Sequence, residues 1–231
     1  MRTLFACGLA ASSLLLAAAP ASAVTFTSAG QYAILTFGGQ VASTGVPNLT
    51  STLKLTFNGF DMGGNATLAY EMDNTSSAPI DSRVSAFGFD VLGAYVHVGN
   101  SSATGEYDSA ASGNVPEGFG FVELCFTAGS NCAGGGNGGI FSADPVATGN
   151  LVIAFSGGSP ASLMLDRLFV RYQSISGTPL GTSGIGSQPI TSFVDPGLVP
   201  EPATWTMLIA GFGLVGVALR RKPRGIARTS S

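Results

Sequence analysis

The segment Thr52-Leu-Lys-Leu-Thr-Phe57 determines the fold class, because apolar and polar side chains alternate in it with a period of two. Successive side chains of a β-strand point to opposite faces, so Leu53, Leu55 and Phe57 would share one buried face. The same pattern recurs between turns rich in Gly, Asn, Asp and Ser, in residues 33–37, 67–72, 86–91, 94–98, 119–126, 151–155 and 163–173. It predicts an all-β, antiparallel β-sandwich of the immunoglobulin-like or jelly-roll type over residues 24–175.

Charged residues are few and unevenly distributed. The 231-residue chain is 45% hydrophobic and 10% charged, with a formal net charge of −3. Five of its ten basic residues lie in the last dozen positions, whereas residues 24–199 contain twelve acidic and four basic side chains, about −8 in net charge. Binding of nucleic acid needs clustered cations, so nucleic acid is not expected as a partner.

The N-terminus has the three parts of a secretory signal peptide. One positive charge, Arg2, precedes an apolar run over residues 4–19, and Pro20-Ala-Ser-Ala23 supplies small residues at a cleavage site. We predict a signal helix in residues 1–23, with Ala21 and Ala23 read by signal peptidase and Val24 as the mature N-terminus. The central region would then lie outside the cytoplasm.

A second apolar run lies near the C-terminus. Residues 205–219 would span about 22 Å as a helix, which is short for the ~30 Å hydrocarbon core of a bilayer. Arg220, Arg221 and Lys222 follow at once, and their long side chains could extend the reach to the cytoplasmic interface. We predict a single transmembrane helix with the preceding domain facing outward. A buried core helix is the alternative that the length also permits.

The C-terminal segment resembles a known sorting signal. Val199-Pro-Glu-Pro-Ala-Thr-Trp205 and the apolar, basic sequence after it are similar to the PEP-CTERM signal, in its PEP-Ala-x-Trp variant, also called the ice-binding protein C-terminal domain. The resemblance rests on Pro200, Glu201, Pro202, Trp205, Gly211, Gly213, Gly216, Arg220, Arg221 and Lys222. It implies a sorting signal in residues 199–224, a tail in residues 225–231 and cleavage by exosortase near the tripeptide. The protein would pass through an inner-membrane intermediate to the cell envelope, the outer surface or the extracellular space.

No cofactor is expected, although part of this segment matches a nucleotide-binding pattern. Gly211-Phe-Gly-Leu-Val-Gly216 fits G-x-G-x-x-G. That fingerprint binds dinucleotides only between a strand and the start of a helix, and here it lies inside the predicted membrane segment. Small residues for close helix packing explain it better.

Two cysteines remain after the predicted signal cleavage. Cys125 and Cys132 form an even, nearby pair in an exported chain, which predicts a disulfide rather than a metal site. This loop, its glycine-rich continuation and residues 169–174 also resemble the cistern group of PEP-CTERM proteins. Residues 176–198 are rich in Gly, Ser, Thr and Pro and predict a flexible linker.

Catalytic groups do not converge in the sequence. His97, the single histidine, is expected to be a half-exposed strand residue, and Glu71 and Asp73 to lie on a solvated strand face. We therefore predict no enzyme but a structural or adhesive β-domain at the cell surface or in a biofilm matrix. A carbohydrate- or calcium-binding module is the alternative, with exopolysaccharide as a partner, and a hydrolase is the third. Stacking surfaces for a glycan could come from Tyr32, Tyr70, Tyr95 and Tyr107.

Overall fold

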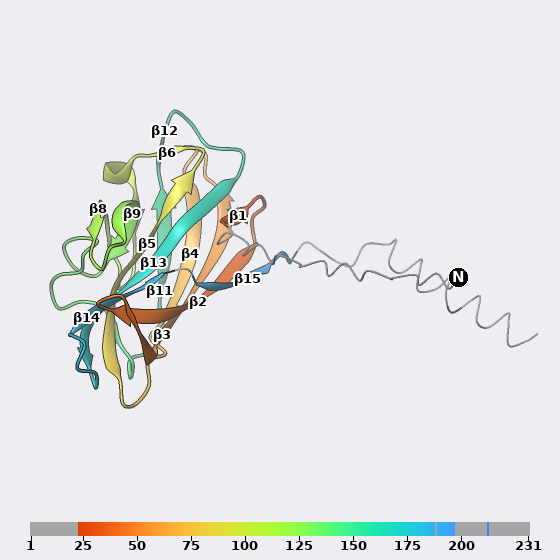
Figure 1. Cartoon of the computed structure of the whole chain (residues 1–231). Helices are drawn as coiled ribbons and strands as arrows, with labels where there is room; N and C mark the ends of the chain where they lie inside the picture. The colour runs from red at the N-terminus through yellow and green to blue at the C-terminus, as the bar shows by residue number, and fades with distance from the viewer. Residues whose placement is uncertain (1–22, 188, 197–211, 213–231) are drawn as a thin grey trace, which may run out of the picture.

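The computed structural model describes residues 23–187, 189–196 and 212. Within residues 23–187 and 189–196 the chain forms fifteen strands and one short 3-10 helix (Figure 1). In chain order they are β1 (Val24–Phe26), β2 (Tyr32–Val41), β3 (Thr44–Phe60), β4 (Ala66–Asp73), β5 (Asp81–Leu92), β6 (Tyr95–Val96), η1 (Val98–Asn100), β7 (Ser102–Ala103), β8 (Ser109–Val115), β9 (Gly120–Thr127), β10 (Ile140–Phe141), β11 (Ala147–Ile153), β12 (Phe155–Ser156), β13 (Leu163–Ser176), β14 (Ser183–Ser187) and β15 (Ile190–Val194). All the strand pairs among these residues are antiparallel, so the predicted all-β, antiparallel class is confirmed.

Thirteen of these strands form one continuous sheet. Ten of them follow the order β7-β11-β4-β3-β2-β14-β13-β5-β9-β8, and β1, β10 and β15 pair at its side with β13, β5 and β2. The strands at the two ends of this order, β7 and β8, contact each other, so the sheet is nearly closed into a barrel. The predicted sandwich of two separate sheets is corrected accordingly, because β14 hydrogen-bonds to a strand of each half.

The inner face of the sheet encloses the main hydrophobic core. Leu53, Leu55 and Phe57 of β3 are at most 1% exposed, whereas Lys54 between them is partly exposed. Across the interior, the ring of Phe87 in β5 lies 5.4 Å from that of Tyr70 in β4 and 5.1 Å from that of Tyr107, measured between centroids. Burial of each large apolar side chain stabilises the fold by about 1.5–3 kcal/mol, so the predicted period-two pattern supplies the main driving force.

Strand β14 joins the two halves of the sheet. Residues 183–187 pair on one side with residues 169–173 of β13, and on the other side Ile185 and Gly186 pair with β2. Strand β15 continues along β2, opposite residues 32–36. The flexible linker predicted over residues 176–198 is therefore corrected for β14 and β15, which belong to the folded domain.

The glycines of β14 reflect close packing. A Cβ atom at Gly186 would lie 2.9 Å from both the Cβ of Phe37 and the Cγ2 of Val170. A Cβ atom at Gly184 would lie 2.3 Å from the carbonyl oxygen of Gln40. Contacts this short are not tolerated, so a strand with side chains at these two positions could not enter between β2 and β13.

A second, smaller apolar cluster covers part of the outer face. Phe169 of β13 and Ile185 of β14 belong to it, together with Val115, Val122, Cys125 and Cys132. These partners come from the β8–β9 hairpin and the loop that follows β9. Because of this outer layer, nine of the twelve residues of β5 are buried, although alternate side chains of a strand point to opposite faces.

Substituting Gly186 by alanine is expected to lower the free energy of unfolding by about 1–3 kcal/mol, because the added methyl group overpacks the interior beside Phe37 and Val170. Gly38→Ala is the matched control on β2, since a Cβ atom there would have no neighbour within 4 Å. Urea unfolding of both variants measures the difference. Equal stability of the two variants would contradict the close fit of β14.

Candidate functional site

The predicted sorting residues lie outside the part of the chain that the structure describes. They are Pro200, Glu201, Pro202, Trp205, Gly211, Gly213, Gly216, Arg220, Arg221 and Lys222, and Ala21 of the predicted signal peptide lies outside it as well. Val24 is described: it is buried and begins β1, opposite Leu165 of β13. The predicted cleavage after Ala23 therefore falls directly before the first strand.

None of the helices in the described residues is long and apolar enough to cross a membrane. The predicted helix over residues 205–219, apart from Phe212, is outside those residues.

The two ends of the β-domain lie beside each other. The rings of Phe26 in β1 and Phe193 in β15 are 5.7 Å apart between centroids. The side chain of Gln31, only 4% exposed, accepts a hydrogen bond from the Thr27 N–H at 2.7 Å and donates one to Asp195 Oδ2 at 2.8 Å. The β1–β2 turn thus holds the chain at Asp195, five positions before the predicted exosortase tripeptide.

The predicted disulfide is present. Cys125 of β9 and Cys132 are joined, with their Cα atoms 5.7 Å apart, as expected for such a bond. It closes the start of a loop that continues through the glycine-rich residues 133–139.

Two buried arginines fasten this loop to the sheet. Arg171 of β13, 4% exposed, donates from Nε to the carbonyl oxygen of Ala133 at 2.8 Å and from Nη1 to that of Gly184 at 2.7 Å. Arg83 of β5 likewise donates to carbonyl oxygens in the loop, including that of Gly136 at 3.1 Å. Burial lowers the pKa of Arg171, but a guanidinium remains charged in proteins. The cations therefore act as hydrogen-bond donors that join the outer loop, β13 and β14.

The side chains considered for catalysis lie apart. His97 is exposed just before η1, rather than in a strand as predicted. Glu71 lies on the outer face of β4 and pairs with Lys54 across the strands at 2.6 Å. Asp73 lies on the same face, so the solvated face predicted for these two carboxylates is confirmed. Among the described residues, no three His, Cys, Asp or Glu side chains are placed to hold a metal ion.

Two of the four tyrosines proposed as stacking surfaces are buried. Tyr70 and Tyr107 are at most 1% exposed; the Tyr107 hydroxyl donates to the carbonyl oxygen of Val84 at 3.0 Å. They belong to the core and cannot stack on a glycan, so that part of the prediction is wrong. Tyr95 is 80% exposed, and the Lys54 ammonium lies 5.2 Å from the ring centroid of the partly exposed Tyr32.

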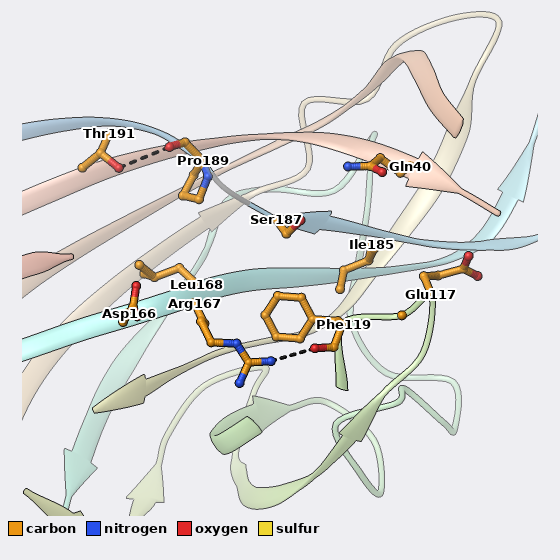
Figure 2. A pocket seen from close by; sticks show the side chains of 11 residues that line it. Gln40, Glu117, Phe119, Asp166, Arg167, Leu168, Ile185, Ser187, Pro189 and Thr191 are labelled. Carbon is orange, nitrogen blue, oxygen red and sulfur yellow. Dashed lines mark hydrogen bonds between the residues drawn. The ribbon is translucent and has the colours of Figure 1, made fainter. Parts of the chain in front are cut away.

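A pocket of about 560 Å³ opens on the outer surface beside β13, β14 and β15 (Figure 2). Gln40 of β2, Glu117 and Phe119 of the β8–β9 turn, Asp166 of β13 and Ser187 of β14 contribute to its lining. The sequence did not indicate this site, because strand pairing between distant segments brings these residues together. The sequence of the β8–β9 turn around Glu117 also matches no ligand-binding motif that would have indicated the pocket.

Arg167 fixes the aromatic side of the pocket. It lies at an irregularity of β13 with φ of +47°, and its guanidinium carbon is 4.8 Å from the ring centroid of Phe119. Nη2 donates to the Phe119 carbonyl oxygen at 2.7 Å, and Nη1 pairs with Asp90 Oδ2 at 2.7 Å. The Arg167 guanidinium thus already has an ion-pair partner, and its contacts with Phe119 hold that ring in place.

These features define an all-β domain in the described residues, and the segment that resembles a sorting signal follows it in the sequence. Comparison with protein families identifies that segment: residues 198–222 match the PEP-CTERM protein-sorting motif, as the resemblance predicted. The motif implies an exported protein that exosortase processes and that is sorted to the cell surface. No curated protein and no solved structure matches the chain.

Arg171→Lys is expected to lower the free energy of unfolding by about 2 kcal/mol, because an ammonium cannot reach both carbonyl oxygens in the fork geometry of a guanidinium. Arg167→Lys is the control: this guanidinium also bonds to two carbonyl oxygens but is exposed, so water can replace the lost bonds and the change should cost about 1 kcal/mol or less. Chemical denaturation measures both. If the two variants lost equal stability, the buried guanidinium would not be fastening the loop.

Alkaline pH is expected to destabilise the fold through the buried tyrosines. Burial raises the pKa of Tyr107 and Tyr172 in the folded state, whereas in the unfolded chain they ionise near pH 10. The contribution of these two tyrosines to the free energy of unfolding is complete below pH 10. Above pH 10 it falls by up to about 1.4 kcal/mol per pH unit for each tyrosine. Tyr107→Phe should reduce this slope in urea unfolding between pH 9 and 11, while Tyr95→Phe should leave it unchanged. If the free energy of unfolding of Tyr107→Phe fell with pH as steeply as that of the wild type, buried Tyr107 would not be a cause of the alkaline destabilisation.

Proposed function

We propose that the β-domain is a non-catalytic structural or adhesive module, exported and placed at the cell surface or in the extracellular matrix. The observation that carries this proposal is the sorting motif at residues 198–222, which begins four positions after the last strand ends at Val194. The signal peptide over residues 1–23 would start the same route, and signal peptidase would release Val24.

The use of polar groups in the domain supports a structural role. Arg83 and Arg171 donate hydrogen bonds to carbonyl oxygens of the loop after the disulfide, and Arg171 also donates to that of Gly184 in β14. The buried hydroxyl of Tyr172 lies 2.7 Å from that of Ser51 inside the core. Arg171 and Tyr172, whose pKa values burial shifts, therefore stabilise the fold, whereas an active site would place such groups around an open pocket.

The distance between domain and signal constrains the processing step. From Asp195, which Gln31 holds, to Pro200 the chain advances five residues, at most about 18 Å when fully extended. Exosortase would therefore cut close to the folded domain. A helix over residues 205–219 would anchor the intermediate in the inner membrane until that cut.

Carbohydrate binding is the second candidate function. The pocket beside Phe119 favours it, because it combines an aromatic ring with polar side chains on an exported protein. Tyr95 adds an exposed ring elsewhere on the surface. The calcium-binding alternative has no comparable arrangement of carboxylates in the described residues.

Replacing Pro200, Glu201 and Pro202 by alanine is expected to abolish a defined C-terminal cut, because the motif would lose the tripeptide that exosortase recognises. Intact-mass analysis of protein recovered from the cell surface and medium measures both ends. The wild-type chain should begin at Val24 and end near the tripeptide.

The control replaces a different proline-containing tripeptide, residues 144–146, which is exposed on the β-domain, by alanine. This variant should be cut like the wild type. Identical C-termini in the wild type and the Pro200-Glu201-Pro202 variant would contradict the processing step.

A further inference from the structure

The pocket beside Phe119 contains polar groups that the fold leaves unused. The side chains of Gln40, Glu117, Asp166 and Ser187 line it and form no hydrogen bond with any described residue. They offer an amide, two carboxylates and a hydroxyl to an occupant. Hydrogen bonding within the described fold leaves these four groups available, so a ligand could pair with each of them.

The same pocket offers a rigid apolar surface. Leu168 and Ile185 line it and are 6% and 4% exposed. The half-exposed ring of Phe119 lies near the centre of the lining residues in Figure 2, with the Arg167 side chain beside it. Phe169 packs against Phe119 at 5.0 Å between centroids. A ligand would thus meet an aromatic ring whose position is fixed before binding.

The charge of the lining excludes anionic ligands. The Arg167 guanidinium is already paired with Asp90 and with carbonyl oxygens, and the buried Arg171 guanidinium attracts Glu117. Asp166 has no ion-pair partner among the described residues, so the lining keeps a net negative charge. Phosphates, sulfates and acidic sugars would be repelled.

Two other occupants fit poorly. An added peptide strand needs N–H groups along the edge it pairs with, but Pro189 has none, and the neighbouring Thr191 hydroxyl donates to the Pro189 carbonyl oxygen at 3.4 Å. A purely apolar ligand would bury the four unused polar groups without partners, at about 1–3 kcal/mol for each.

We propose that this pocket binds a sugar unit without an acidic group, as part of an extracellular polysaccharide. A sugar ring has an apolar C–H face for Phe119 and a rim of hydroxyls that donate to the carboxylates and exchange hydrogen bonds with the amide of Gln40. The volume of about 560 Å³ lies within the ~300–1,000 Å³ of small-molecule sites. The inference rests on the proposed location at the cell surface, and it names the class of ligand that the domain would bind there.

The test is calorimetric titration of the mature protein with hexasaccharides of α-1,4-, β-1,3- and β-1,4-linked glucose, with a β-1,6-linked glucosamine pentamer and with hexagalacturonate as the acidic probe. At least one of the four non-acidic probes is expected to bind more tightly than hexagalacturonate. Gln40→Ala and Asp166→Asn should each weaken that binding about tenfold. Phe119→Ala should abolish it.

Matched controls are Asn58→Ala and Asp73→Asn, the same kinds of change at surface positions outside the pocket; both should bind like the wild type. Phe119 also packs in the fold, so the Gln40 and Asp166 variants decide the result if Phe119→Ala unfolds. The proposal is overturned if the wild type binds none of the four non-acidic probes at 10 mM. It is equally overturned if Gln40→Ala and Asp166→Asn bind unchanged, or if hexagalacturonate binds most tightly.

Surface delivery separates this inference from the proposed function. The Gln40→Ala variant should be exported and cut as the wild type is, because the pocket is not part of the sorting signal. If the wild type reached the cell surface normally but bound no saccharide, only the inference about the pocket would be wrong. Failure of the wild type to reach the surface would remove the proposed function itself.

Discussion

The fold depends on the insertion of β14 between β2 and β13. This five-residue strand hydrogen-bonds to both neighbours and turns two halves of β-structure into one curled sheet. The insertion is possible because Gly184 and Gly186 leave room for the backbone of Gln40 and the side chains of Phe37 and Val170. Two small residues in a short strand thus decide whether the core is enclosed.

The same strand links the interior to the surface features. The carbonyl oxygen of Gly184 accepts from Arg171, which also holds the loop after the Cys125–Cys132 disulfide. Ile185 belongs to the outer apolar cluster and lines the pocket beside Phe119. Strand β15 then carries the chain along β2 to Asp195, three positions before the sorting motif in the sequence. The fold and the pocket beside Phe119 therefore both depend on β14.

Much of this organisation could be predicted from the sequence, and the failures have physical reasons. Period-two patterns such as residues 52–57 identified the strands, and two nearby cysteines in an exported chain identified the disulfide. The linker predicted over residues 176–198 was wrong at β14 and β15, because a glycine required by close packing cannot be told by composition from a glycine in a flexible segment. Tyr70 and Tyr107 were misassigned as surface rings, since a phenol can be buried when its hydroxyl finds a carbonyl oxygen. The pocket beside Phe119 could not be predicted, because its lining residues come from segments far apart in the sequence and form no local sequence pattern.

The central claim is that β14 is an integral strand of the mature domain, and amide hydrogen exchange tests it most directly. Backbone N–H groups in residues 184–187 are expected to exchange as slowly as those in residues 169–173 of β13, because both exchange only when the sheet opens. The exposed turn residues Met62 and Gly63 supply the fast reference within the same molecule. Exchange in residues 184–187 as fast as in that turn would show that the sheet closes without β14, and would contradict the claim.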